Sequence, residues 1–238
     1  MLVVTVLGMS GLRVDRLRFD TASLLWVAVW LTSMAGMPVL FRWLGMGMLG
    51  AAVYLAVAFA MYYGGLTLVL GHHGSERLIA RFGSRRAVWW FEMWLGIAFT
   101  HQALAQGILV SASSTRLALD VPMGLTATVG ILAVVVSLIV KIWSTHLVGL
   151  DAYYYVDMFL QRKQAMHPTR QALVARGPYR WLNNPMYGVG NLCAYGMALI
   201  KHSWLGLIAS AAAQICIYTF YFRHERPFVR RHYLAHPV

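Results

Sequence analysis

Long apolar stretches separated by short polar segments run along most of the chain. Four of these stretches are at least 20 residues long: 21–40, 47–70, 88–110 and 121–140. A helix of about 20 apolar residues crosses the hydrocarbon core of a bilayer. A further stretch, 186–222, exceeds the length of one span, and the polar run 201–203 interrupts it. We therefore expect a tight helical hairpin over 186–200 and 204–222, and about six membrane-spanning helices in all.

Two segments outside these spans are also expected to be helical. Residues 1–10 are apolar but too short to span, and they precede the charged run 13–20. A cleavable signal peptide has the opposite order, with positive charge first, so we expect an interfacial helix. The fourth apolar stretch keeps its helical pattern past the membrane edge, and we expect one long helix that continues to Leu160.

Composition supports a membrane location. Hydrophobic residues make up 59% of the 238 residues and charged residues 12%, with a mean hydropathy of +0.60. A soluble domain of this length cannot bury that much apolar surface, whereas lipid solvates the outer faces of helices. The fold expected is an all-α, polytopic membrane helix bundle.

The net charge of +12 follows the same segments. Sixteen of the 20 Lys and Arg residues fall before the first span, after the second, after the fourth and in the tail, against three on the alternate side. Positive charge accumulates on the cytoplasmic side, which predicts six spans with both termini cytoplasmic. The remaining cation, Lys141, lies near the cytoplasmic end of the fourth span, where its side chain can extend to the interface.

This distribution also bears on partners and location. The basic residues form no separate domain, so the partners expected are the lipid bilayer and a membrane phospholipid, and no nucleic acid. The abundance of Ala, Gly and Arg favours a bacterial inner membrane, with an endoplasmic-reticulum origin as the alternative. The oligomeric state is left open.

Polar residues within the apolar stretches have modest expected roles. Glu92 and His101 lie in the third span, where hydrogen bonds between helices are their expected function. Cys193 and Cys216 sit inside apolar runs without a metal-binding spacing, and we expect both to be packing residues and no metal site.

The chain is expected to form one membrane domain with two parts. Residues 1–150 supply the N-terminal spans, and residues 151–238 supply a cytoplasm-facing loop, the helical hairpin and the tail. We find no internal repeat, and the polar chemistry is concentrated in the second part. Transporters often show inverted repeats with broken helices in both halves, so this asymmetry favours a membrane enzyme.

The segment 151–159 combines acids with tyrosines at the end of the fourth span. Tyrosine at this depth is typical of an interfacial aromatic belt, but Asp151 and Asp157 are not. Six residues apart on a helix, the two acids face different directions, so we expect no shared metal. We expect Asp151, Tyr155 and Asp157 to contribute to substrate binding.

The segment 176–190 combines a turn, amide and aromatic side chains, and a helix start. Pro185 suits the first turn of that helix and Asn184 can cap it. Free backbone N–H groups at such an end attract an anionic group. Gly188 and Gly190 allow close approach of a ligand or of backbone.

An antiparallel hairpin brings the end of its second helix beside the start of its first. Glu225 is therefore expected near Asn184 and Tyr187. An acid surrounded by arginines is often only a surface ion pair, which contributes little, and the predicted pairing with the turn favours a functional role.

These residues resemble the phosphatidylethanolamine N-methyltransferases. The resemblance rests on Asn183-Asn-Pro-Met-Tyr187, on Glu225-Arg-Pro-Phe228, and on the segments 150–152 and 157–159. The wider superfamily includes the isoprenylcysteine carboxyl methyltransferases, and the match covers about a third of the chain. Departures are Arg226 where the family has a second Glu, and Asn183-Asn184 where the wider family has Arg-His.

The resemblance implies S-adenosylmethionine at the cytoplasmic end of the last helices and a lipid acceptor that enters from the bilayer. The implied cofactor-binding residues are Asn184, Pro185, Tyr187, Gly188, Gly190, Arg180 and Glu225. The catalytic residues expected are Glu225, Tyr187 and His224, and Arg176 joins the substrate-binding set. Either arginine can pair with the cofactor carboxylate or the lipid phosphate. His224, Glu225 or a water takes the proton of the acceptor amine.

Three alternatives stay open at this point. One is methylation of another lipophilic acceptor, such as a prenylated carboxylate. Another is a sterol-reductase-like NADPH oxidoreductase, whose loops usually carry an acid where this chain has Val189 and Gly190. The last is a non-catalytic membrane protein with the same fold.

Overall fold

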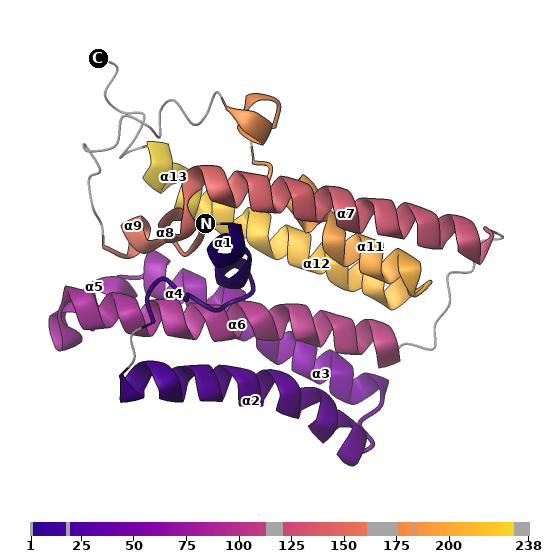
Figure 1. Cartoon of the computed structure of the whole chain (residues 1–238), viewed down its shortest axis with the longest axis horizontal. Helices are drawn as coiled ribbons and strands as arrows, with labels where there is room; N and C mark the ends of the chain where they lie inside the picture. The colour runs from indigo at the N-terminus through magenta and orange to yellow at the C-terminus, as the bar shows by residue number, and fades with distance from the viewer. Residues whose placement is uncertain (1, 18–19, 113–120, 161–175, 183, 231–238) are drawn as a thin grey trace.

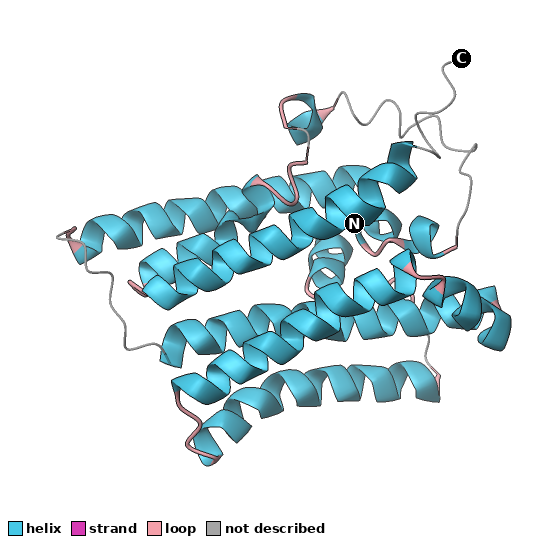
Figure 2. Cartoon of the chain, turned by 180° about the vertical axis from the view of Figure 1, so that it is seen from behind, coloured by secondary structure: helices cyan, strands magenta, loops and turns pink. Residues whose placement is uncertain are grey.

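The computed structural model of the chain describes residues 2–17, 20–112, 121–160, 176–182 and 184–230. Within these residues the regular structure is helical throughout (Figures 1 and 2). The expected all-α membrane helix bundle is confirmed.

Five helical segments are long and apolar enough to cross a membrane. The first four are α2 (Thr21–Trp43), the continuous segment Met48–Gly71, α6 (Ser84–Ala112) and α7 (Met123–Val148), and the fifth is Trp204–Val229. Their positions agree with the apolar stretches of the sequence because each stretch contains the length that a span needs.

Two of these spans contain a short π-helical segment. In the second span, η1 (Ala60–Gly64) joins α3 (Met48–Phe59) to α4 (Gly65–Gly71). In the last, η4 (Tyr221–Glu225) joins α12 (Trp204–Phe220) to α13 (Arg226–Val229). Single π turns inside α-helices are frequently found at functional sites.

The first helix of the hairpin is shorter than the sequence predicts. It comprises η3 (Val189–Asn191) and α11 (Leu192–Ile200), and together these are only 12 residues long. Residues 184–188 form turns instead of helix, and Gly188 has φ −80° and ψ −98°. A helix of this length covers about 18 Å, less than the hydrocarbon core of a bilayer, so the expected sixth span is partly turn.

The long helices form two groups that meet at α6. Figures 1 and 2 place α2, α3 and α6 on one side and α7, α11 and α12 on the other. Packing between α7 and α11 is close because Gly130 and Gly196 face each other; a Cβ at Gly196 would lie 2.5 Å from the Gly130 carbonyl oxygen. Small residues at helix crossings are typical of membrane bundles.

The expected long helix to Leu160 is wrong. α7 ends at Val148, and Gly149 has φ +82°, a value that favours glycine and turns the chain. Two single-turn helices follow, α8 (Leu150–Tyr153) and α9 (Val156–Phe159). The directions of the side chains in this segment are therefore set by two tight turns and not by the periodicity of one long helix.

The N-terminal segment forms the expected helix, α1 (Leu2–Met9). It packs against α7 and α8, and the Tyr154 hydroxyl donates a 2.7 Å hydrogen bond to the carbonyl oxygen of Gly8. The loop expected after the second span contains a further helix, α5 (Gly74–Phe82), which packs against α4 and α6.

Candidate functional site

The hairpin brings Tyr187 and Glu225 together, as the sequence predicts. The Tyr187 hydroxyl donates a 2.6 Å hydrogen bond to a Glu225 carboxylate oxygen. The hydroxyl oxygens of Tyr155 and Tyr187 lie 2.5 Å apart. We refer to these three residues as the phenol–carboxylate chain. It links α9, the turn before η3 and the end of the last span.

The turn that carries Tyr187 is held by its own polar groups. The Asn184 side-chain oxygen accepts from the Tyr187 N–H at 3.2 Å. This contact closes a turn and is not the predicted helix cap, because the helix begins only at Val189. The Asn184 carbonyl accepts from the Gly188 N–H at 3.0 Å, and the Pro185 carbonyl accepts from the Gly190 N–H at 2.8 Å. Asn183 of the family motif lies outside the described residues. Asn184, Pro185, Gly188 and Gly190 thus support the turn that positions Tyr187.

A glutamine that the sequence analysis missed fastens this turn to α12. Gln214 donates to the Tyr187 carbonyl oxygen at 2.6 Å and accepts from the Asn191 side chain at 2.6 Å. A polar amide inside an apolar span is the signal that marks such a residue, because its donors and acceptor need partners at membrane depth.

Aromatic rings surround the carboxylate end of the chain. The Tyr221 ring lies 5.9 Å from that of Tyr187 and 6.4 Å from that of Tyr218, and Phe222 stacks on Tyr218 at 5.9 Å. Such rings present negatively polarised faces, which attract cations. A half-buried carboxylate among aromatic rings is therefore a setting suited to a positively charged ligand.

Tyr155 reaches Tyr187 from a strained backbone. Its φ of +56° lies in the left-handed region, which non-glycine residues rarely adopt. The side chain is buried, and its ring packs edge-on against Phe220 at 5.4 Å. Backbone strain of this kind is concentrated at functional sites, where the surrounding structure over-determines it.

Burial keeps the phenols of this chain neutral. Burial, together with the negative charge of Glu225 and the neighbouring Tyr155, raises the pKa of Tyr187 well above its ordinary value. Burial likewise raises the pKa of Tyr155. Both side chains therefore hold a proton at physiological pH and can donate it in a hydrogen bond.

Tyr62 is a second residue that sequence reasoning missed. It lies in the π segment η1, is 8% exposed, and packs in the same buried cluster as Tyr155 and Phe220. The run of two tyrosines and two glycines at 62–65, in the middle of an apolar stretch, is the signal that marks it. The N-terminal half of the chain therefore contributes to the surroundings of the site.

His224, an expected catalytic residue, points away from Tyr187. Its ring packs on Phe220 at 5.5 Å and lies 6.5 Å from the ring of His72, at the end of α4. A Cβ at Gly71 would touch the same ring, at 2.5 Å. His224 and Glu225 are adjacent in η4 and so face different sides of the helix, which leaves Glu225 alone beside Tyr187.

Three other expected site residues lie at η2 (Gly177–Arg180) and on α9. Arg176 and Arg180 are exposed at the ends of η2, whose glycine packs on Trp143 and Leu147 of α7. Asp157 is buried in α9, at 7% exposure. Their roles toward cofactor or substrate stay predictions.

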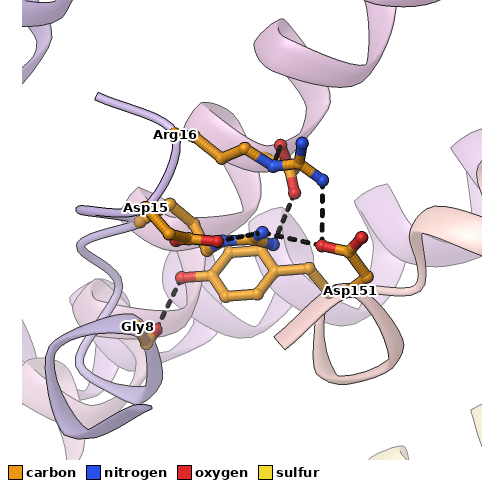
Figure 3. Close-up of polar contacts among 7 residues, drawn as sticks. Gly8, Asp15, Arg16 and Asp151 are labelled. Carbon is orange, nitrogen blue, oxygen red and sulfur yellow. Dashed lines mark hydrogen bonds and ion pairs between the residues drawn. The ribbon is translucent and has the colours of Figure 1, made fainter. Parts of the chain in front are cut away.

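Asp151 belongs to a separate ion-pair cluster around a buried guanidinium (Figure 3). Arg13 is 1% exposed, and its guanidinium lies 2.5 Å from a Glu92 oxygen, 2.7 Å from an Asp15 oxygen and 2.7 Å from an Asp151 oxygen. Arg16 adds a 2.9 Å contact to Asp151 and a 3.6 Å contact to Glu92. The cluster ties the N-terminal segment to α6 and α8.

This cluster gives Asp151 and Glu92 structural partners. Burial alone would raise the pKa of Asp151, but the guanidinium groups of Arg13 and Arg16 outweigh it and hold that pKa below its ordinary value. The Asp151 carboxylate is thus ionised and already paired, which is at odds with its expected contact to substrate. The expected helix-to-helix contact is present for His101, whose ring nitrogen lies 2.5 Å from the Tyr54 hydroxyl on α3. Glu92 pairs instead with Arg13 and Arg16, which are not helical and lie between α1 and α2.

A cavity of about 260 Å³ adjoins the phenol–carboxylate chain inside the bundle. Tyr62, Tyr155 and Tyr187 line it at the site end. From there, its wall follows α6 from Phe99 to Ser111 and the hairpin helix from Gly190 to Lys201. Twelve residues of α6 correspond to about 18 Å, so the cavity is long and narrow.

Comparison with known proteins points to lipid chemistry. Residues 125–236 match the family model described as phospholipid methyltransferase. The chain is 33% identical over 104 residues to a phosphatidylethanolamine N-methyltransferase of Schizosaccharomyces japonicus. The aligned stretch is 44% of this chain but only 11% of that relative's length. No solved structure matches the chain. Both matches confirm the predicted family resemblance, and the residues of the family match include the phenol–carboxylate chain.

Proposed function

We propose that this chain, whose residues 125–236 match the phospholipid methyltransferase family, transfers a methyl group from S-adenosylmethionine to the amine of a membrane phospholipid. The expected acceptor is phosphatidylethanolamine or its methylated forms. The observation that carries the proposal is the 2.6 Å hydrogen bond between Tyr187 and Glu225, which holds one half-buried carboxylate among aromatic rings. Donor and acceptor of this reaction are both cations, and such a setting attracts cations.

The residues present fit the cofactor in kind. When bound, S-adenosylmethionine supplies an activated methyl group on a positively charged sulfur. Glu225 offers the opposite charge, and Tyr187, Tyr218 and Tyr221 offer ring faces within one aromatic cluster. The backbone at Gly188 is close to Tyr218, since a Cβ there would lie 3.4 Å from the Tyr218 hydroxyl. A side chain at that position would narrow the space in front of the rings.

Glu225 is the expected proton acceptor. A phospholipid amine is protonated at neutral pH and must lose a proton before its nitrogen can form a new bond. His224 faces α4, so Glu225 is the better placed of the two expected bases. The Tyr187 hydroxyl donates a hydrogen bond to one carboxylate oxygen, which fixes the orientation of Glu225 and leaves the second oxygen to accept the proton of the amine.

The bundle contributes position more than covalent chemistry. Holding nitrogen, methyl carbon and sulfur in line converts a bimolecular reaction into an effectively unimolecular one. The turn at 184–188 is held at both ends, by its own backbone contacts and by Gln214. Because the spans place the site beside lipid, the acceptor can enter from the bilayer.

The test is the Glu225→Gln variant, which removes the charge at constant size. We expect transfer of labelled methyl groups to phosphatidylethanolamine in purified, reconstituted protein to fall by about a hundredfold, the lower end of what a general base contributes. The matched control is Glu76→Gln, which neutralises an exposed acid on α5.

The acceptor panel includes phosphatidylethanolamine, its monomethyl form and a prenylated carboxylate. Size-exclusion profiles show whether both variants fold. Full methyl transfer by a folded Glu225→Gln protein would remove Glu225 from the mechanism, and labelling of the prenylated carboxylate alone would replace the proposed acceptor.

A further inference from the structure

Lys141 points into the bundle instead of toward the interface. Its ammonium lies 5.1 Å from the centre of the Phe99 ring on α6, and the side chain lines the cavity. The stem packs against the hairpin, since a Cβ at Gly190 would lie 3.5 Å from Lys141 Cβ and Cγ. The expectation that this side chain extends to the membrane surface is therefore wrong, because α7 presents it to α6 and the hairpin.

No carboxylate among the described residues pairs with Lys141. The ion pairs of the described residues gather around Arg13 and between His73 and Glu76, and none includes this lysine. Its ammonium faces the Phe99 ring, and Cys193 is a further neighbour. An ionised group at membrane depth is costly unless it is paired, and it is by default a sign of function.

Two further polar groups of the same cavity are buried without a partner. The Tyr153 hydroxyl and the Gln106 amide nitrogen are both inaccessible and make no hydrogen bond within the described chain. The Tyr153 ring lies 5.9 Å from Phe99, the ring that Lys141 also faces. Gln106 is two turns further along α6, about 10 Å away. All three groups can donate hydrogen bonds, so the missing partner is an acceptor, and at Lys141 it is negatively charged.

We infer that this cavity binds an anionic oxygen group on Lys141 and Tyr153, and that the group is the phosphodiester of the acceptor phospholipid. The inference rests on the proposed function. The cavity continues between α6 and α11, past the apolar side chains of Ala103, Val110, Ala194 and Met197, which suit an acyl chain. Gln106 lies along that path, where the lipid's ester carbonyls can accept a hydrogen bond from it.

This placement also directs the amine. In phosphatidylethanolamine two carbons separate the phosphodiester from the nitrogen. Tyr155 and Tyr187 line the same cavity as Lys141, so a headgroup anchored by its phosphate extends its amine toward the phenol–carboxylate chain. The lysine would then select lipids that carry a phosphodiester.

The carboxylate of S-adenosylmethionine has the same anionic chemistry, so the test separates the two sources. The probes are short-chain phosphatidylmethanol, which has the phosphodiester but no amine, the matching diacylglycerol, and S-adenosylhomocysteine. Binding is measured by titration calorimetry of the purified full chain in a neutral detergent.

The variant is Lys141→Met, and the control is Arg42→Met, which removes an exposed cation in the last turn of α2, outside the cavity lining. We expect Lys141→Met to lower the affinity for phosphatidylmethanol at least tenfold and to leave the affinities for the other two probes unchanged. The Arg42→Met protein should bind all three probes as the unaltered protein does.

If Lys141→Met weakened the binding of S-adenosylhomocysteine and left the binding of phosphatidylmethanol unchanged, the anion would belong to the cofactor. That result would overturn the lipid assignment. Unchanged binding of both would overturn the site itself. Lys141→Met should melt no lower than the unaltered protein, because it removes a half-buried charge that has no carboxylate partner among the described residues. Lys141→Gln provides a second neutral variant if Lys141→Met does not fold. Failure of the proposed function appears separately, as absence of methyl transfer by the unaltered protein.

Discussion

The hydroxyl of Tyr187 takes part in two hydrogen bonds, and only one can use its own proton. Because Glu225 accepts from it, the Tyr155 hydroxyl must be the donor in the bond between the two tyrosines. The two phenols therefore act in series, and Tyr155 supports the carboxylate only through Tyr187. Loss of the Tyr187 hydroxyl should therefore have a larger effect than loss of the Tyr155 hydroxyl.

Tyr187→Phe removes the bond to the carboxylate, and Tyr155→Phe leaves it in place. A hydrogen bond to a charged group contributes about 1.5–3 kcal/mol, and we expect Tyr187→Phe to lower kcat/KM for methyl transfer roughly tenfold to a hundredfold. Tyr155→Phe loses a neutral bond of about 1 kcal/mol, or roughly fivefold. Steady-state kinetics of the two variants check the order, and an equal or larger effect of Tyr155→Phe would contradict it.

At the scale of elements, the N-terminal segment is part of the framework of the site. Arg13 joins it to Glu92 on α6 and to Asp151 on α8, and α8 precedes the strained Tyr155 by only a few residues. Burial alone would lower the pKa of Arg13, but its carboxylate partners outweigh it and raise that pKa, so the guanidinium stays charged.

Arg13→Met should be strongly destabilising because it leaves the fully buried Glu92 without its closest cation. Breaking a buried pair by removing one partner costs about 3–5 kcal/mol. Arg16→Met is the matched control from the same cluster. That arginine is 39% exposed, and its loss should cost at most about 1 kcal/mol.

Thermal unfolding in detergent, followed by circular dichroism, compares the two arginine variants. Replacing Glu92 by Met in the Arg13→Met protein should recover part of the loss, because no unpaired carboxylate then remains buried. Equal melting temperatures for the two single variants would show that burial of the guanidinium contributes nothing measurable.

Across the whole molecule, the hydropathy of the sequence was sufficient to locate the spans. It was not sufficient to locate the turns that end or interrupt the helices. The apolar stretches predicted the bundle because a span needs length and apolarity. The meeting of Tyr187 and Glu225 followed from the antiparallel hairpin alone. The break after α7 was missed although Gly149 stands where helices commonly end on glycine.

Other features depend on contacts that no local pattern encodes. Arg13 is buried only because Glu92 and Asp151, far apart in sequence, converge on it. The inward direction of Lys141 depends on which face of α7 meets the hairpin. A membrane-edge lysine and a cavity lysine look the same in the sequence.

Orientation in the membrane is a prediction for the molecule as a whole. The charge distribution predicts that the start of α6 is cytoplasmic and that the hairpin turn lies on the other side. In a background with Cys193 and Cys216 replaced by Ala, a membrane-impermeant maleimide should label Lys201→Cys in intact cells. It should label Ser84→Cys only after permeabilisation. The reverse pattern would invert the topology.

The π segments η1 and η4 have a consequence for insertions and deletions. A π turn accommodates one residue more than an α turn, and removing that residue restores the regular helix. Each residue of an α-helix turns the chain by about 100°. Deletion of one residue would therefore rotate all residues that follow it by about 100° around the helix axis. In the last span this would swing Glu225 out of line with Tyr187 while every side chain remained. The spacing of residues there is therefore as much a determinant of the site as their identity, and a shortened homologue would keep the motif and lose the alignment.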